Sequence, residues 1–362
     1  MSFQALHYVP CLRWKQGEYK AVSLLSDSAR DLITPLIEVP EKGYDFETQT
    51  DKKSLDDHLA PFAKRLHSNW QTKICFVDLK LIDPSERLKS GTHPVRYIFE
   101  QLNLYGCSGI PVTGFDRDPQ YQHEVKRAVS KDRRGLCIRL SIESAAKSSL
   151  KASVATLLGS NMPIEECDLI LDLEAPPNFV PLEGFANLIQ SIILRLPYLD
   201  RWRTFTLMGS SFPSSMAEIT TSPMVIPRNE WLVYKLLRTK LSSGDTRIPT
   251  FGDYVINHPE VLQVDMRLVK PAATIRYTID DAWLIIKGPN VRDHGYGQYL
   301  DHCKTLTSDP RFLDSTFSGA DKYISDCAAG RAKTGNLSTW RWIGTNHHLE
   351  KLALDIANLF GA

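Results

Sequence analysis

Eight short apolar runs alternate with amphipathic stretches between residues 5 and 255, and this alternation constrains the fold more than any other feature of the sequence. The runs have the length of buried strands, whereas the stretches between them repeat apolar residues at helical spacing. Strict alternation of strand and helix gives right-handed crossovers and a parallel sheet. Eight such units predict closure into a (β/α)₈ barrel of the TIM-barrel type. The runs span residues 5–9, 33–39, 74–79, 110–114, 135–140, 168–173, 203–208 and 248–255.

An open, doubly wound parallel sheet is the alternative architecture. Sheets of that kind that bind dinucleotides carry a glycine-rich turn after the first strand. The sequence has no such turn at that place, and Gly295-Tyr296-Gly297 lies far downstream and lacks the third glycine. The barrel is therefore the preferred prediction.

The alternation of strand and helix ends near residue 258. Two apolar runs at 274–279 and 282–287, joined by a pair of aspartates, predict an antiparallel hairpin. Helical patterns follow it to the end of the chain. We therefore predict a barrel domain over residues 1–258 and a C-terminal hairpin and helical cap over residues 259–362, packed on the barrel.

Composition narrows the class of protein. Lys and Arg number 43 and Asp and Glu number 42, so the net charge of +1 creates no global field that would recruit nucleic acid or an acidic membrane. The chain opens without a signal-peptide pattern, and its apolar runs are too short to span a bilayer. Seven scattered cysteines are typical of a reducing compartment. We expect a cytoplasmic protein without a membrane anchor.

Ionisable residues follow nearly every predicted strand, and the C-terminal strand ends are where a parallel barrel usually carries its site. Because strand side chains alternate between faces, residues two apart on one strand share a side. The predicted catalytic cluster at this barrel mouth consists of Asp78, Lys80, Arg139, Glu143, Asp172 and Glu174, and the predicted binding residues beside it are Glu38 and Asp116.

This cluster has two interpretations. In a functional one, carboxylates hold Mg²⁺ or act as general acid and base, while Arg139 and Lys80 bind an anion such as phosphate. In a structural one, the same groups pair with one another and close the barrel mouth, because buried charges need partners. The residue types fit both interpretations. In the functional one, Asp78, Asp172 and Glu174 are the candidates for metal ligands or for acid and base.

Two other features are better explained by structure than by chemistry. The adjacent His347 and His348 would point in different directions on a helix and could not readily chelate one metal ion. The basic run between Lys126 and Arg134 ends a predicted helix and precedes a strand, on the face of a barrel opposite the site. We therefore expect no direct binding of nucleic acid.

Short motifs in a fixed order cover nearly the whole chain. They are Tyr8-Val9-Pro10, Lys15-Gln16-Gly17-Glu18, Pro35-Leu36-Ile37-Glu38-Val39-Pro40, Arg228-Asn229-Glu230-Trp231, Phe251-Gly252-Asp253-Tyr254, Tyr277-Thr278 and the segment from Trp342 through His347-His348-Leu349. In this order they resemble the phage and bacterial "beta protein" family. The resemblance implies a barrel-like protein associated with phages, prophages and mobile elements, with no established catalytic set. It adds Arg228, Trp231, Asp253 and Tyr254 as candidate binding residues.

The resemblance, the balanced charge and the lack of a complete catalytic motif favour a recognition protein that binds a phage or host protein, in phage defence or counter-defence. The alternative is a metal-dependent hydrolase that acts on phosphodiester or nucleotide substrates at the barrel mouth. No cofactor is evident from the sequence, and Mg²⁺ would belong to the hydrolase. The sequence does not decide whether the protein is an enzyme.

Overall fold

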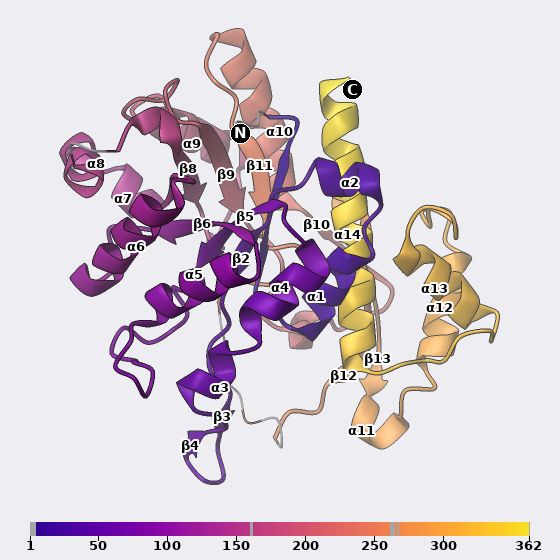
Figure 1. Cartoon of the computed structure of the whole chain (residues 1–362). Helices are drawn as coiled ribbons and strands as arrows, with labels where there is room; N and C mark the ends of the chain where they lie inside the picture. The colour runs from indigo at the N-terminus through magenta and orange to yellow at the C-terminus, as the bar shows by residue number, and fades with distance from the viewer. Residues whose placement is uncertain (1–4, 160–161, 261–264, 266–267, 362) are drawn as a thin grey trace.

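The computed structural model describes residues 5–159, 162–260, 265 and 268–361 (Figure 1). In this part of the chain eight parallel strands form a closed barrel, in the order β1-β11-β9-β8-β7-β6-β5-β2. The strands are β1 (Tyr8–Leu12), β2 (Leu36–Glu38), β5 (Ile74–Asp78), β6 (Ser108–Thr113), β7 (Leu136–Ser141), β8 (Cys167–Asp172), β9 (Thr204–Gly209) and β11 (Thr250–Asp253). The predicted (β/α)₈ barrel is confirmed, because β1 pairs with both β2 and β11 and leaves no open edge.

Helices connect the strands and cover the outside of the barrel (Figure 1). They are α1 (Gln16–Ser23), α2 (Asp27–Asp31), α3 (Leu55–Leu59), α4 (Phe62–Trp70), α5 (Pro94–Leu104), α6 (Pro119–Asp132), α7 (Ile142–Ala145), α8 (Leu150–Leu158), α9 (Leu182–Ile193) and α10 (Asn229–Ser243). The connection between β1 and β2 contains two helices, α1 and α2, in place of one continuous helix. The reason is local, because the Ser26 side chain accepts a hydrogen bond from the Ala29 amide and begins a new helix.

The interior of the barrel follows from the alternation of side chains along each strand. Inward positions hold a cluster of mainly apolar side chains, among them Leu36, Phe76, Cys137 and Ile170. The next inward position on each of these strands, two residues later, is an ionisable residue. The apolar filling therefore ends in a polar layer at the C-terminal mouth of the barrel.

The predicted hairpin is confirmed. Strands β12 (Ala272–Ile279) and β13 (Ala282–Asn290) pair antiparallel, and β10 (Met224–Pro227) adds a third strand beside β13. Since β10 precedes residue 258, the segment expected to form the barrel supplies one strand of this sheet. The division of the chain at residue 258 stays a prediction.

The last helix joins the two parts of the molecule. After α11 (Val291–His294), α12 (Tyr299–Thr307) and α13 (Gly319–Ala328), helix α14 (Leu337–Phe360) runs beside α1 and α2 in the outer layer of the barrel (Figure 1). Its C-terminal half packs in the main core through Leu349, Leu352 and Ile356, and its N-terminal half packs with the hairpin through Trp340 and Trp342. Among the described helices, none is both long and apolar enough to cross a membrane.

Candidate functional site at the barrel mouth

Four strands place ionisable side chains at the inner mouth of the barrel. Glu38 ends β2, Asp78 ends β5, Asp172 ends β8, and Arg139 lies two residues before the end of β7. In the barrel register Glu38 is the partner of Asp78, so these two carboxylates lie on neighbouring strands. The exposed fraction of each of the four residues is 6% or less.

Arg139 is the centre of this mouth cluster. Its Nε donates to Oδ2 of Asp172 at 2.8 Å, and its Nη1 donates to Glu38 at 2.8 Å and to Asp78 at 2.9 Å. Its Nη2 donates to the Tyr254 hydroxyl at 2.7 Å and also lies 2.7 Å from Asp172. A guanidinium has five N–H donors. The N–H groups of Arg139 point at acceptors within the protein: Glu38, Asp78, Asp172 and Tyr254.

Three further cations surround the buried carboxylates. Arg117 donates to both oxygens of Asp78 at 3.2 Å. Lys80 Nζ lies 3.9 Å from Oε1 of Glu38, and Arg13 Nε lies 3.8 Å from Oε2 of the same carboxylate. The acids of the cluster are therefore matched by cations without any added ion.

The pKa shifts in the cluster agree with this matching. Burial alone would raise the pKa of Asp78, but the charges of Arg117, Arg139 and Lys80 outweigh burial and lower it. Burial opposes the charge on Arg139 as well, yet Tyr254, Asp172 and other neighbours raise the pKa of its guanidinium. Asp78 and Arg139 are thus held in their charged forms. A general acid at neutral pH would need a carboxyl pKa raised toward the working pH, and Asp78 shows the opposite shift.

The structure brings most of the predicted mouth residues together: Glu38, Asp78, Lys80, Arg139, Asp172 and Glu174. Tyr254, a candidate only through the family resemblance, joins them by donating to Asp172. Glu174 lies at the rim, where its side chain is 58% exposed and its Oε1 is 3.3 Å from Lys80 Nζ. Asp116 also lies at the rim and pairs with Arg117. Glu143 lies in the first turn of α7, and within the described residues no hydrogen bond or ion pair joins it to Arg139.

Arg13 and Arg117 complete the cluster, although neither was among the predicted site residues. The same sequence signal points to both of them, because Arg13 directly follows β1 and Arg117 follows β6 by four residues. The sequence does not show that Arg13 lies near Glu38, because the two residues belong to different βα units.

The space above the cluster is small. A cavity of about 90 Å³ lies between Lys80, Arg117, Arg139 and Glu174. Sites for organic ligands usually enclose several hundred cubic ångströms. This cavity holds a few water molecules at most, so Arg139 and its partners close the barrel mouth.

The geometry of the cluster does not fit Mg²⁺. A divalent cation needs several oxygen ligands that converge on one point. Here Glu38, Asp78 and Asp172 converge on the guanidinium of Arg139, which already supplies the positive charge. In the described part of the chain, no group of three or more His, Cys, Asp or Glu residues is arranged to hold a metal ion.

Asp253 forms a second buried network, on the outer side of β11. Its Oδ1 accepts a hydrogen bond from the Tyr8 hydroxyl at 2.5 Å, and its Oδ2 lies 2.8 Å from Nε2 of His348. The Thr278 hydroxyl lies 2.7 Å from Nδ1 of the same ring. Burial would raise the pKa of Asp253, but His348, Arg228 and Tyr8 outweigh burial and lower it. The network thus joins the barrel, the hairpin and α14.

The candidate binding residues Arg228 and Trp231 belong to this interior as well. Arg228 is fully buried, and its guanidinium lies over the rings of Trp231 and Trp283 at 5.4 and 5.9 Å. Trp231 is 3% exposed and packs edge-on against Phe251. These residues hold the hairpin against the barrel, and a partner at the surface could not reach them.

The chain matches one family model, and its structure aligns with several solved structures. A family model described as Beta protein matches residues 8–353. Triosephosphate isomerase from Bartonella henselae aligns with a TM-score of 0.35 at 13% identity, over 68% of this chain and 91% of that one. A mutant tryptophan synthase alpha-subunit from Pyrococcus furiosus aligns with a TM-score of 0.38 at 9% identity, over 70% and 90%. The GH53 catalytic domain from Ignisphaera aggregans gives 0.40 at 10% identity, over 70% and 88%. No curated protein matches the sequence.

Proposed function

The chain belongs to the Beta protein family, and from this premise we propose that it is a recognition protein that binds a protein partner and does not catalyse a reaction. The observation that supports this proposal is the closed barrel mouth. Arg139 is bonded to Glu38, Asp78, Asp172 and Tyr254, and these contacts use the donors that a substrate anion would need.

The energetic argument concerns what a substrate would have to replace. Binding at the mouth would require Arg139 to leave at least one buried carboxylate unpaired, and breaking a buried ion pair costs about 3–5 kcal/mol. An enzyme site is instead preorganised, with donors already aimed at the place where charge develops. The mouth cluster has the properties of a structural closure that makes the barrel a rigid scaffold.

The biological setting of the proposal comes from the family resemblance. Members are associated with phages, prophages and mobile elements, so we place the partner among phage or host proteins, in defence or counter-defence. The cytoplasm is the proposed compartment, since phage and host proteins meet there.

The test is recovery and reconstitution of a complex. The tagged full chain is expressed in its native host, with and without phage infection, and co-purified proteins are identified. We expect a partner that reforms a stoichiometric complex from the two purified proteins in light scattering coupled to size exclusion. If the chain stays a single species with every recovered candidate, the proposal is wrong.

The hydrolase alternative has a separate test. Purified chain is assayed on phosphodiester and nucleotide substrates with divalent metal ions, beside the variant Asp172→Asn. A metal-dependent activity that Asp172→Asn abolishes while the unfolding midpoint stays unchanged would overturn the proposal. Asp31→Asn is the matched control, because the side chain of Asp31 is 70% exposed and Asp31 ends α2, ahead of the N-terminal end of β2, whereas the mouth cluster lies at the C-terminal strand ends.

A further inference from the structure

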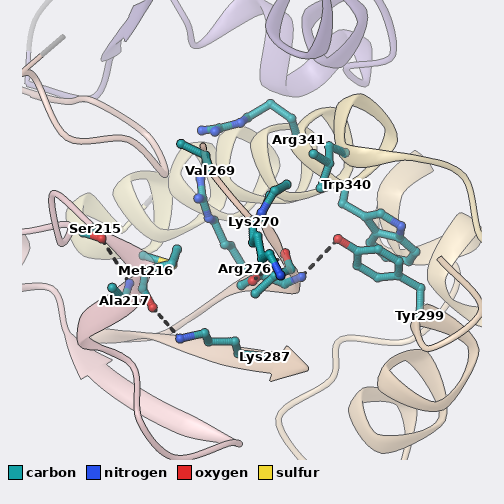
Figure 2. A pocket seen from close by; sticks show the side chains of 14 residues that line it. Ser215, Met216, Ala217, Val269, Lys270, Arg276, Lys287, Tyr299, Trp340 and Arg341 are labelled. Atoms are coloured by element: carbon teal, nitrogen blue, oxygen red, sulfur yellow. Dashed lines mark hydrogen bonds between the residues drawn. The ribbon is translucent and has the colours of Figure 1, made fainter. Parts of the chain in front are cut away.

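A polar cavity outside the barrel mouth is lined mainly by the C-terminal elements (Figure 2). It has a volume of about 530 Å³. Its walls come from residues 215–217 at the start of a short 3-10 helix, from β12 and the segment before it, from Lys287 on β13, and from α12 and α14. This volume is in the range of cavities that take small organic ligands.

The charged side chains that line this cavity are all basic among the described residues. Its lining includes Lys270, Arg276, Lys287 and Arg341, and no Asp or Glu is among the described residues that line it. The chain as a whole carries nearly equal numbers of acids and bases. Lys270 is paired with Asp293, whose Oδ2 lies 3.2 Å from its Nζ. The other three cations, Arg276, Lys287 and Arg341, form no ion pair among the described residues, so the cavity concentrates positive charge that the composition does not reveal.

The cations of the cavity are oriented by neutral groups. Arg276 donates from Nη1 to the Ile256 carbonyl at 3.1 Å, and Arg341 donates to the side-chain oxygen of Asn257. Within the described residues no carboxylate forms an ion pair with either arginine. Lys287 donates to two backbone carbonyls of the segment 216–219, both at 2.7 Å. These bonds orient the side chains, and none of them is an ion pair. The charge of Glu18 acts on Arg341 from beyond ion-pair distance.

Partial burial makes this arrangement of cations costly. Burial lowers the pKa of Arg276, and the nearby charge of Arg341 lowers it further. Burial also lowers the pKa of Arg341, although Glu18 opposes the shift. Buried cations in proteins are normally paired with an acid or a bound anion. Two neighbouring arginines without such a partner favour an anionic ligand.

The remaining wall is apolar and rigid. The rings of Tyr299 and Trp340 stack on each other, with centroids 4.3 Å apart and planes 6° apart. The Tyr299 hydroxyl accepts a hydrogen bond from the Thr274 amide, and the Trp340 indole donates to the Thr334 carbonyl. Their polar atoms are thus satisfied inside the protein. The wall suits the organic part of a ligand better than a free inorganic ion.

We propose that this cavity binds a small organic phosphate, with the phosphate group between Arg276, Arg341 and Lys287 and the organic part against the Tyr299–Trp340 wall. Guanidinium groups match the geometry of phosphate oxygens through paired hydrogen bonds. Several cations around one site suit the double charge of a phosphate ester better than a single carboxylate. This inference does not depend on the proposed protein partner.

The first experiment measures binding to the full chain by calorimetry, with AMP, glucose 6-phosphate, inorganic phosphate, adenosine and glucose as probes. We expect at least one phosphate ester to bind about tenfold or more tightly than its uncharged counterpart and to raise the unfolding midpoint. Tighter binding of AMP identifies a nucleotide site, and tighter binding of glucose 6-phosphate identifies a sugar-phosphate site. If neither ester binds, or adenosine binds as tightly as AMP, the proposal is overturned.

The second experiment separates a binding site from a structural one. Arg276→Met and Arg341→Met each remove a partly buried cation that forms no ion pair in the described part of the chain. We therefore expect each variant to lose binding of the ester about tenfold or more, while the unfolding midpoint of the unliganded chain stays the same or rises. Arg331→Met is the matched control, since the side chain of Arg331 is 65% exposed and pairs with Asp326.

The outcomes also distinguish this inference from the proposed function. A variant that loses the ester but still forms the protein complex shows that the two are independent. If Arg276→Met and Arg341→Met both lower the midpoint of the unliganded chain and leave ester binding unchanged, the two arginines are structural and the cavity proposal is wrong.

Discussion

Nε2 of His348, in the last helix, lies 2.8 Å from Oδ2 of Asp253, at the end of the eighth barrel strand. The other oxygen of Asp253 accepts from Tyr8 on the first strand. One carboxylate thus connects both strands at the seam of the barrel with the helix that covers them. Residues that resemble family motifs far apart in the sequence meet at this point.

The first prediction concerns that carboxylate. Asp253→Ala leaves Tyr8, His348 and Arg228 without their common partner inside the protein. We expect the free energy of unfolding to fall by about 3–5 kcal/mol, as for other buried charge partners, in urea denaturation followed by circular dichroism. Asp301→Ala is the control, because the Asp301 side chain is 79% exposed. Equal stability of the two variants would show that Asp253 does not hold the seam.

Glu230 should lower the free energy of unfolding as pH rises, whereas most acids in folded proteins raise it. Burial raises its pKa to about 7, against the lowering effects of Arg228 and of the hydrogen bond from Ser211. Between the ordinary glutamate pKa and pH 7 the unfolded chain releases a proton that the folded chain retains. Stability from this group is therefore lost as pH rises through that window.

The measurement compares the parent with Glu230→Gln across that window. We expect the parent to lose stability relative to the variant by roughly 3 kcal/mol between pH 4.5 and pH 8. Glu183→Gln should show no such trend, because the Glu183 side chain is 61% exposed. A difference between parent and Glu230→Gln that does not change with pH would contradict a raised pKa.

The mouth cluster predicts the effect of removing its central cation. Arg139→Met leaves the carboxylates of Glu38, Asp78 and Asp172 buried without their shared partner. We expect the free energy of unfolding to fall by about 3–5 kcal/mol at pH 8. Near pH 5 the fall should be smaller, because the unpaired buried carboxyl groups can take up protons and become neutral. Chemical denaturation at both pH values measures this.

The control for this cluster is Arg201→Met. The Arg201 side chain is 59% exposed in its pair with Glu165, so the change should cost at most about 1 kcal/mol. If Arg139→Met is as stable as this control, the charges at the mouth do not hold the barrel closed.

Gly252 tests the packing beneath the mouth. A Cβ atom at this position would lie 2.8 Å from the Val9 carbonyl oxygen and 3.1 Å from the Met208 side chain. We expect Gly252→Ala to destabilise the chain by about 1–3 kcal/mol, measured by thermal unfolding. Gly297→Ala should leave the midpoint nearly unchanged, because a Cβ there meets no atom within 4 Å. Identical midpoints would mean that the strands can separate to accept the methyl group.

The site could be predicted only in part. Strand-end position identifies Glu38, Asp78, Arg139 and Asp172, because alternation along a strand fixes which side chains face inward. It does not identify their partners, since hydrogen bonds such as that from Arg139 to Glu38 cross the barrel between residues 101 positions apart.

The sequence by itself predicted the barrel, because periodic apolar residues indicate eight alternating strands and helices, and the glycine-rich turn of a dinucleotide-binding open sheet is missing after the first strand. It also determined the hairpin through the pattern of its two strands. Only the tertiary structure decided that the ionisable groups at the mouth pair with one another and that Arg276 and Arg341 share a cavity. Charge pairing depends on distances between strands and helices that are remote in sequence, and such distances are set by packing and leave no periodic signal in the chain.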